Sequence, residues 1–214
     1  MNKVLPAEIH SVVFQNPIWG IVYNNETNSL IVDSRNEESK EIKVSQLEMN
    51  SFEKNPTQIA LVWWERLVGI KYGQLYSVKY ESENDPSNYS LKQIDLATGK
   101  KELIKDLPEI SSPSLEPALY EMDSEHHQTV AQFLAIELPL PCEYLEFENN
   151  IIISYYLRSE QGFERFLLLL QDGQKKWKVK QDSQMKGFSS GAFFVIHDKL
   201  VFVRDRNEVC IYSF

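Results

Sequence analysis

Four stretches of the chain repeat one plan, in which a short apolar run is followed by a second strand-like run and a polar turn. The apolar runs begin at Leu30, Leu75, Ile151 and Leu200, so successive copies lie 45, 76 and 49 residues apart. The wide middle gap leaves room for a degraded fifth copy near Leu119-Tyr120, 44 residues after Leu75. A period of roughly 40–50 residues built from short strands constrains the chain to a series of small, similar sheets.

Two kinds of strand alternate along this repeat. The first runs are apolar at nearly every position, which is typical of strands buried on both faces. The runs that follow alternate polar and apolar residues, as in Lys176–Lys180, and this suits outer strands with one solvated face. Propeller blades combine both kinds, so we predict an all-β, single-domain β-propeller of four or five small blades over residues 1–214. A β-sandwich or an incomplete barrel is the alternative, because regularly spaced short strands suit those folds too.

The two ends of the chain predict their own pairing. The last copy has strand-like runs at 192–196, 199–204 and 208–214, which is one strand short of a four-stranded blade. Glu8–Phe14 is strand-like and has no partner of its own. We expect this N-terminal strand to pair with the C-terminal copy and close the ring, because that removes two sheet edges. The stretch Leu107–Pro117 is the one loop-like break of note.

Local turn signals predict hairpins at Asn24–Asn28, Ala97–Lys100 and Gln171–Gln174. Asp172-Gly173 is the strongest of these signals, because Asp and Gly accept left-handed backbone angles. The best helical candidate is Ser124–Leu138, but its apolar period is not sustained, and we do not predict a helix there.

Composition narrows the range of partners. The net charge of −9 and the lack of a basic cluster argue against nucleic acid and anionic membranes. The first residues lack the apolar core of a secretory signal peptide, and no apolar run is long enough to cross a bilayer. We therefore expect a cytoplasmic protein in which the two cysteines, Cys142 and Cys210, are buried free thiols.

One turn carries a resemblance to a known family. Asp95–Leu103 resembles the turn of a quinoprotein-type propeller blade, in which an Asp-x-x-Thr-Gly-Lys segment leads to a docking tryptophan. In this chain Leu103 stands near the position of that tryptophan. Leu170–Trp177 is a second, partial match that keeps the tryptophan. The resemblance covers about two of the four copies and implies the fold, since nothing corresponds to the quinone pocket or metal site of that family.

A second resemblance rests on a wider set of segments, namely Ile18-Trp19, Leu30–Arg35, Val62–Trp64, the Asp95 turn, and Glu143–Leu145 before Ile151. This set is similar to a bacterial family of domains of unknown function with propeller-like repeats. The resemblance implies a bacterial cytoplasmic protein and transfers no catalytic residue.

Two motifs have the composition of a catalytic or metal site, but the residues around them argue against both functions. Gly187–Gly191 fits the G-x-S-x-G pattern, but a nucleophile elbow needs a helix after the serine, and Ala192–Ile196 reads as a strand. We therefore predict a loop. His126-His127 stands beside acidic residues, yet adjacent histidines on a strand would face opposite ways, and only His10 and His197 remain as distant partners. We predict a solvated polar loop there and no metal site.

The candidate binding residues are Trp63, Trp64, Arg66 and Arg35. Neighbouring strand residues face opposite ways, so at most one of the two tryptophans can join a given packing layer. An exposed tryptophan beside an arginine is a common composition for an interaction hot spot, although packing between blades is the structural alternative. Arg35 follows an inner strand, where it could face a central channel or pair with Asp33.

Together these features predict a non-catalytic binding or scaffold module with a protein partner or a small ligand and without a cofactor. The contact surface would lie near Trp64 and Arg35. The alternative is a propeller enzyme or small-ligand sensor with its site in the axial channel. The polar residues available there are Arg35, Asp33, Tyr155 and Arg204.

Overall fold

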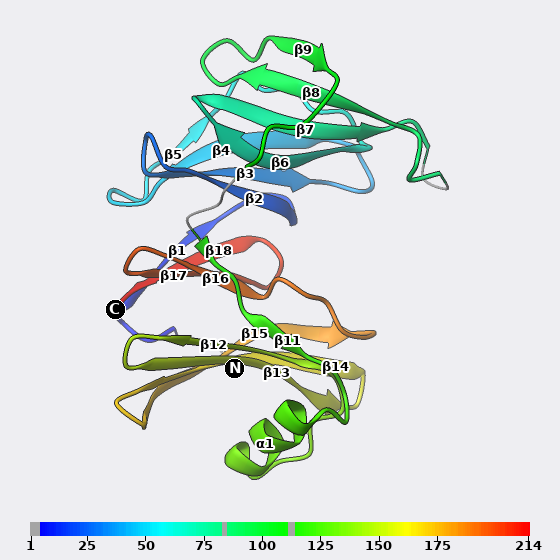
Figure 1. The fold of residues 1–214 in the computed structure, drawn as a ribbon. Coiled ribbons are helices and arrows are strands. Elements are labelled where there is room, and N and C mark those ends of the chain that lie inside the picture. The colour runs from blue at the N-terminus through cyan, green and yellow to red at the C-terminus, as the bar shows by residue number, and fades with distance from the viewer. Residues whose placement is uncertain (1–4, 83–84, 111–113) are drawn as a thin grey trace. The chain divides into compact units, whose positions relative to one another are not determined.

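The computed structural model describes residues 5–82, 85–110 and 114–214, and it forms two compact units (Figure 1). Unit 1 comprises Met1–Ser11 and Ser114–Phe214, and unit 2 comprises Val12–Pro113. The chain returns to unit 1 inside the predicted break at Leu107–Pro117, of which residues 111–113 lie outside the described part. Antiparallel strands dominate both units, so the all-β class is confirmed. The single domain stays a prediction.

Unit 2 contains two four-stranded antiparallel sheets whose strands follow chain order. The first sheet consists of β2 (Ile18–Asn24), β3 (Ser29–Arg35), β4 (Ile42–Glu48) and β5 (Lys54–Pro56). The second consists of β6 (Glu65–Lys71), β7 (Gln74–Tyr80), β8 (Tyr89–Asp95) and β9 (Lys101–Ile104). Ile31 and Val44 of the first sheet share a buried apolar cluster with Leu75 and Ile94 of the second, so the two sheets have a common core.

Unit 1 contains two five-stranded antiparallel sheets. One has the order β1 (Ile9–Val13), β18 (Glu208–Ser213), β17 (Lys199–Arg204), β16 (Phe193–Ile196), β10 (Ser114–Leu115). Only the last two residues of its strand β1, Val12 and Val13, belong to unit 2. The other has the order β11 (Ala118–Tyr120), β12 (Cys142–Phe147), β13 (Asn150–Ser159), β14 (Gly162–Gln171), β15 (Gln174–Met185). Leu167 and Trp177 of the second sheet pack with Phe193 and Phe202 of the first in the main core of the unit.

The predicted repeat corresponds to these four sheets. Each sheet contains four neighbouring strands in series, namely β2–β5, β6–β9, β12–β15, and β16–β18 followed by β1. Leu30, Leu75, Ile151 and Leu200 lie in the second strands of these series, β3, β7, β13 and β17. The candidate fifth copy at Leu119-Tyr120 does not form its own sheet, because β11 pairs with β12 at the edge of an existing one. All four sheets are open in the described part of the chain, and the propeller arrangement stays a proposal.

The predicted pairing of the chain ends is confirmed, because β1 lies beside β18 in the first sheet of unit 1. Ile9 enters the main core of the unit, and Glu8 forms an ion pair with Lys176 of β15 at 3.2 Å. The N-terminal strand therefore completes a sheet that the C-terminal residues alone leave short.

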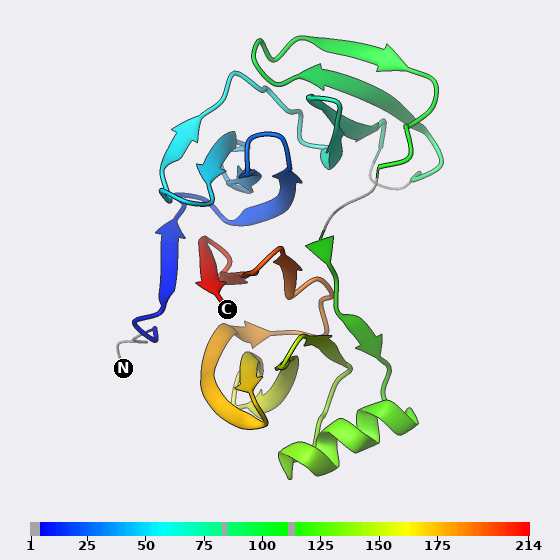
Figure 2. The ribbon, with the colours of Figure 1, turned by 60° about the vertical axis from the view of Figure 1, so that its left-hand side comes forward.

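The three predicted hairpins are confirmed, but the segment around residue 130 corrects the sequence prediction. It forms helix α1 (Glu125–Leu134), which Figure 2 shows in green beside the sheet of β11–β15. Ser124 caps the helix by accepting a hydrogen bond from the main-chain N–H of His127 at 3.2 Å. Tertiary contacts compensate for the short apolar period, because Val130 packs on Ile153 and Leu168 of the sheet.

Candidate functional site

The predicted tryptophans lie in a turn that leads into β6, and they face different surroundings. Trp63 is half-buried and packs edge-on against Trp19 of β2, with ring centroids 5.4 Å apart. The ammonium of Lys40 lies 4.3 Å from the centre of the Trp63 ring. Trp64 is 37% exposed. The exposed side chains of this stretch alternate in sequence: Val62, Trp64, Arg66 and Val68. Their role in binding stays a prediction.

Arg35 is fully buried, so it offers no side-chain surface to a partner. Its Nε lies 3.0 Å from both carboxylate oxygens of Asp33, which is the pairing that the sequence left as an alternative. Its terminal nitrogens donate to the main-chain carbonyl oxygens of Trp63 and Glu65. Burial raises the pKa of the Asp33 carboxyl, and the bonds and charge of Arg35 oppose that shift. Arg35 therefore joins the two sheets of unit 2.

Glu65 forms a second buried polar centre in unit 2. Its carboxylate accepts hydrogen bonds from the Ser77 hydroxyl at 2.7 Å and from the Lys101 ammonium at 2.6 Å. It also accepts from the main-chain N–H of Val62 at 3.2 Å, next to the two tryptophans. Burial alone would raise the pKa of Glu65, but the bonds from Lys101 and Ser77 leave that pKa below its ordinary value. This network orients the turn before β6.

The G-x-S-x-G motif is a loop between β15 and β16, as predicted, and buried side chains of unit 1 hold it. The Glu143 carboxylate accepts from the main-chain N–H groups of Gly191 at 2.5 Å and Ala192 at 3.0 Å. The Tyr156 hydroxyl accepts from the Ser189 N–H at 3.1 Å and donates to the Ser189 carbonyl oxygen at 2.9 Å. These contacts fix the position of the loop main chain.

The two adjacent histidines lie in the first turn of α1, so the prediction of a polar loop there was wrong. His127 is buried, and its Nε2 lies 3.0 Å from the carbonyl oxygen of Leu140. His126 is exposed and stacks on Tyr120 of β11, with ring centroids 4.9 Å apart. Consecutive helical residues differ in direction by about 100°, which explains the different surroundings of the pair.

A pocket of about 310 Å³ lies beside α1 in unit 1, and four helical residues form one of its walls. These residues are His126, Thr129, Val130 and Phe133, which share one side of the helix at the spacing i, i+3, i+4, i+7. Val130 anchors this side of the helix to the sheet, whereas Phe133 is 59% exposed at the pocket.

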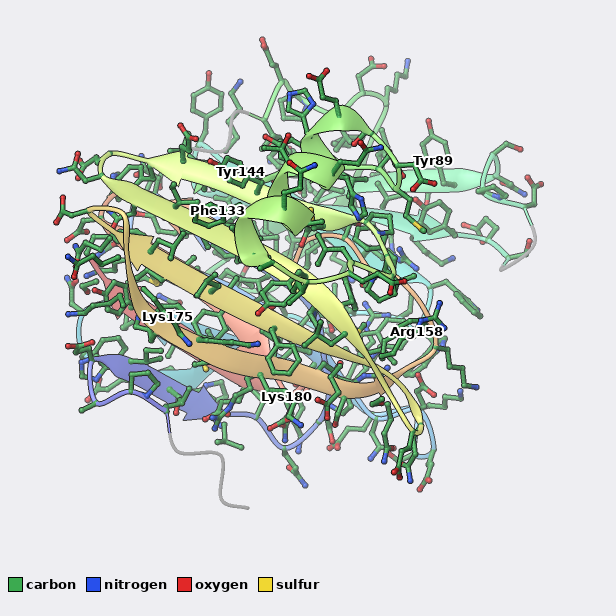
Figure 3. All side chains as sticks on the ribbon, turned by 90° about the horizontal axis from the view of Figure 1, so that it is seen from below. Tyr89, Phe133, Tyr144, Arg158, Lys175 and Lys180 are labelled. Carbon is green, nitrogen blue, oxygen red and sulfur yellow. The ribbon has the colours of Figure 1, made fainter. Side chains whose placement is uncertain are left out.

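The sheet forms the opposite wall. Tyr144 is paired with Ile153 and Glu146 is paired with Ile151 across β12 and β13, so these four side chains share one face of the sheet. Tyr120 of β11 stacks on Tyr144, with ring centroids 5.4 Å apart and planes inclined by 20°. Figure 3 shows Phe133 on the helix close to Tyr144 on the strand beneath it.

The chemistry of the pocket is aromatic and apolar with one carboxylate. The Tyr144 hydroxyl donates a hydrogen bond to Glu146, and burial together with this carboxylate raises the pKa of Tyr144. Tyr144 therefore stays protonated at neutral pH. The Thr129 hydroxyl donates to the carbonyl oxygen of Glu125 at 2.9 Å, so the helix main chain uses this donor. Such a pocket suits binding of a largely apolar group.

This pocket was not predicted from the sequence. Tyr120 and Tyr144 are 24 residues apart and meet only because β11 pairs with β12. The signal that was present is the helical spacing of residues 126, 129, 130 and 133 after Ser124, a residue type that favours the N-cap position.

The other residues considered in the sequence, Tyr155, Arg204 and the two cysteines, make contacts that stabilise the fold. Tyr155 lies in β13, where its ring stacks on Phe166 with centroids 5.9 Å apart. Arg204 of β17 donates to Glu208 at 2.5 Å. Cys142 and Cys210 are free and buried, as predicted, and burial raises the pKa of the Cys142 thiol to about 11. Burial also raises the pKa of the Cys210 thiol, so both thiols are protonated at neutral pH.

No protein-family model matches the chain, and neither does any curated protein. Among the described residues, no group of three or more His, Cys, Asp or Glu side chains is arranged to hold a metal ion. The described helix is too short and too polar to cross a lipid bilayer.

Proposed function

We propose that this protein is a non-catalytic binding module of the propeller type, and that it holds its ligand in the pocket beside α1. The observation that carries the proposal is the construction of the pocket, in which a helix and three strands converge on about 310 Å³ lined mainly by aromatic and aliphatic side chains. Ligand sites in proteins typically have this size and composition, with few polar groups.

The distribution of polar groups supports binding rather than covalent chemistry. The hydroxyls of Tyr144 and Thr129 already donate within the protein, and Tyr144 is held protonated. A hydroxyl nucleophile has to lose its proton, whereas burial, together with the hydrogen bond to Glu146, raises the pKa of Tyr144 and so disfavours its phenolate. These contacts therefore favour noncovalent binding of a ligand in the pocket.

Two observations support the propeller type. Each of the four sheets contains a series of four neighbouring strands whose second member, β3, β7, β13 or β17, has a buried apolar run, which is the pattern of a blade. The N-terminal strand β1 lies beside β18, the strand at the other end of the chain. The bacterial cytoplasm remains the proposed location.

The experiment compares recovery of bound material by three tagged proteins from the native cytosol. Thr129→Trp places an indole in the pocket, whereas Gln132→Trp places the same side chain at an exposed position of α1 that does not line it. Circular dichroism and thermal unfolding check that all three are folded, and mass spectrometry identifies retained small molecules and proteins.

We expect the wild type and Gln132→Trp to retain the same compound or partner, and Thr129→Trp to lose it. Equal retention by all three proteins, or no retained material from any of them, would contradict binding in this pocket.

A second contact surface is proposed on unit 2, where Trp64 and Arg66 are exposed in an alternating stripe. Exposed tryptophan and arginine are enriched in interaction hot spots, so a protein partner is the expected occupant. A Trp64→Ala, Arg66→Ala double variant should lose that partner and remain folded, because Glu65 and Arg35 still hold the turn. Full affinity of this double variant for the partner would reject the surface.

A further inference from the structure

We propose that the pocket beside α1 selects a small organic cation whose nitrogen carries methyl groups, with a free quaternary ammonium compound as its ligand. This inference rests on the proposed function, since it names the chemical class that the same pocket would take. Three features of the pocket carry it: its aromatic rings, its charge and its shortage of free hydrogen-bonding groups.

The aromatic rings provide the first feature. Tyr120, Tyr144 and Phe133 line the pocket, and the stacking of Tyr120 on Tyr144 keeps two of the rings in place. The faces of aromatic rings carry partial negative charge and attract cations within about 6 Å of the ring centre. Because the rings come from β11, β12 and α1, a ligand between the helix and the sheet can contact several of them.

Charge provides the second feature. Glu146 lines the pocket with a carboxylate. Among the described lining residues there is no lysine or arginine, and the basic side chain is the imidazole of His126, which stacks on Tyr120. The hydrogen bond from Tyr144 holds this carboxylate at the pocket wall while leaving its negative charge in place. The whole chain carries a net charge of −9, which also favours the approach of cations over anions.

The shortage of free polar groups distinguishes methylated from bare ammonium ions. A primary ammonium has three N–H donors that lose water on entry and need acceptors. Besides its aromatic rings, the lining offers Val130, Ile151 and Ile153. Its polar groups are the Glu146 carboxylate, the His126 imidazole and three hydroxyls, and two of those hydroxyls, on Thr129 and Tyr144, already donate within the protein. A trimethylammonium group has no N–H donor and presents methyl groups to such walls, so its desolvation costs less.

The test is a calorimetric titration of the full chain with three probes of similar size. Choline is the expected ligand type, 3,3-dimethylbutan-1-ol is its neutral carbon isostere, and ethanolamine carries the bare ammonium. We expect choline to bind at least about tenfold more tightly than either of the others. Equal affinity for choline and the alcohol would overturn the selection for charge, although binding in the pocket would stand.

Single substitutions test which side chains of the pocket determine the affinity for choline. Glu146→Gln keeps the shape of the side chain and should weaken choline about fivefold to tenfold while leaving the affinity for the alcohol unchanged. Glu148→Gln is the matched control, because this exposed carboxylate lies two residues further along and does not line the pocket. Phe133→Ala should weaken both probes. Equal loss of choline affinity in the Glu146 and Glu148 variants would overturn the role of Glu146.

A second arm separates two sources of the same chemistry. A short peptide that contains trimethyl-lysine carries the same cation on a protein chain. Tighter binding of choline than of this peptide supports the free compound, and the reverse order overturns that part of the proposal. If neither probe binds to the wild type, the inference fails, while the recovery experiment with Thr129→Trp decides the proposed function independently.

Discussion

The guanidinium of Arg35, in the last residue of β3, donates a hydrogen bond to the main-chain carbonyl oxygen of Glu65, the first residue of β6. This contact joins the two sheets of unit 2 through a buried charge. The same guanidinium is neutralised by Asp33, so the cross-sheet contact depends on an ion pair within β3.

Arg35→Ala should lower the free energy of unfolding by about 3–5 kcal/mol, because it leaves the Asp33 carboxylate buried without a counter-charge. Urea unfolding at pH 7 measures this change. Arg66→Ala, at an exposed position near the same turn, is the control and should change the value by less than about 0.5 kcal/mol. An Asp33→Asn, Arg35→Met double variant should recover part of the lost free energy of unfolding, because it removes the unpaired carboxylate as well. Equal stability of the Arg35→Ala variant and the wild type would refute this role.

Stability of unit 2 should depend on the ionisation of Glu65. Its pKa in the folded protein lies below its ordinary value of about 4.3, so the unfolded chain binds the proton more readily. The stabilisation is therefore fully present above the unfolded pKa and is lost as the pH falls through the folded pKa.

We expect Glu65→Gln to lose about 2–3 kcal/mol at pH 7 and to lose less as the pH falls below about 4. Urea unfolding of both proteins from pH 7 to pH 3 gives the difference curve. A difference that stays constant over this range would show that the charge of Glu65 contributes nothing.

Tyr156→Phe should loosen the Gly187–Gly191 loop, because it removes both hydrogen bonds that the hydroxyl makes with Ser189. The expected cost is about 1–3 kcal/mol, with faster hydrogen exchange of the loop amides. Tyr155→Phe is a matched control on the neighbouring residue, where ring stacking on Phe166 is retained. Identical exchange in the wild type and the Tyr156 variant would mean that Glu143 alone holds the loop.

Gly99→Ala should destabilise the Asp95 turn more than Gly173→Ala destabilises the Asp172 turn. Both glycines have positive φ, of 70° and 73°, so an alanine is strained at each by about 1 kcal/mol or more. A Cβ at position 99 would also lie 2.4 Å from the carbonyl oxygen of Gln58, whereas position 173 has open space. We expect an additional cost of about 1–3 kcal/mol at Gly99. Equal unfolding midpoints would show that Gln58 moves aside.

Much of the fold could be predicted from local pattern. The runs at Leu30 and Leu75 lie in the central strands β3 and β7, because fully apolar runs have to be buried on both faces. The Asp172-Gly173 signal forms its hairpin, with Gln171 paired to Gln174. Helix α1 could not be predicted with the same rule, because its short apolar side gains stability only by packing on the sheet.

The sequence alone was sufficient for the class of the fold and the pairing of the chain ends, because strand period and turn chemistry act over neighbouring residues. It left the number of copies at four or five, and the pairing of β11 with β12 decided against a separate fifth sheet. Tertiary structure decided which polar and aromatic groups meet. Arg35 is held by carbonyl oxygens of Trp63 and Glu65, and main-chain acceptors leave no mark in a sequence. Tyr120 and Tyr144 face α1 because of strand register, which depends on pairing between distant segments rather than on the local residues.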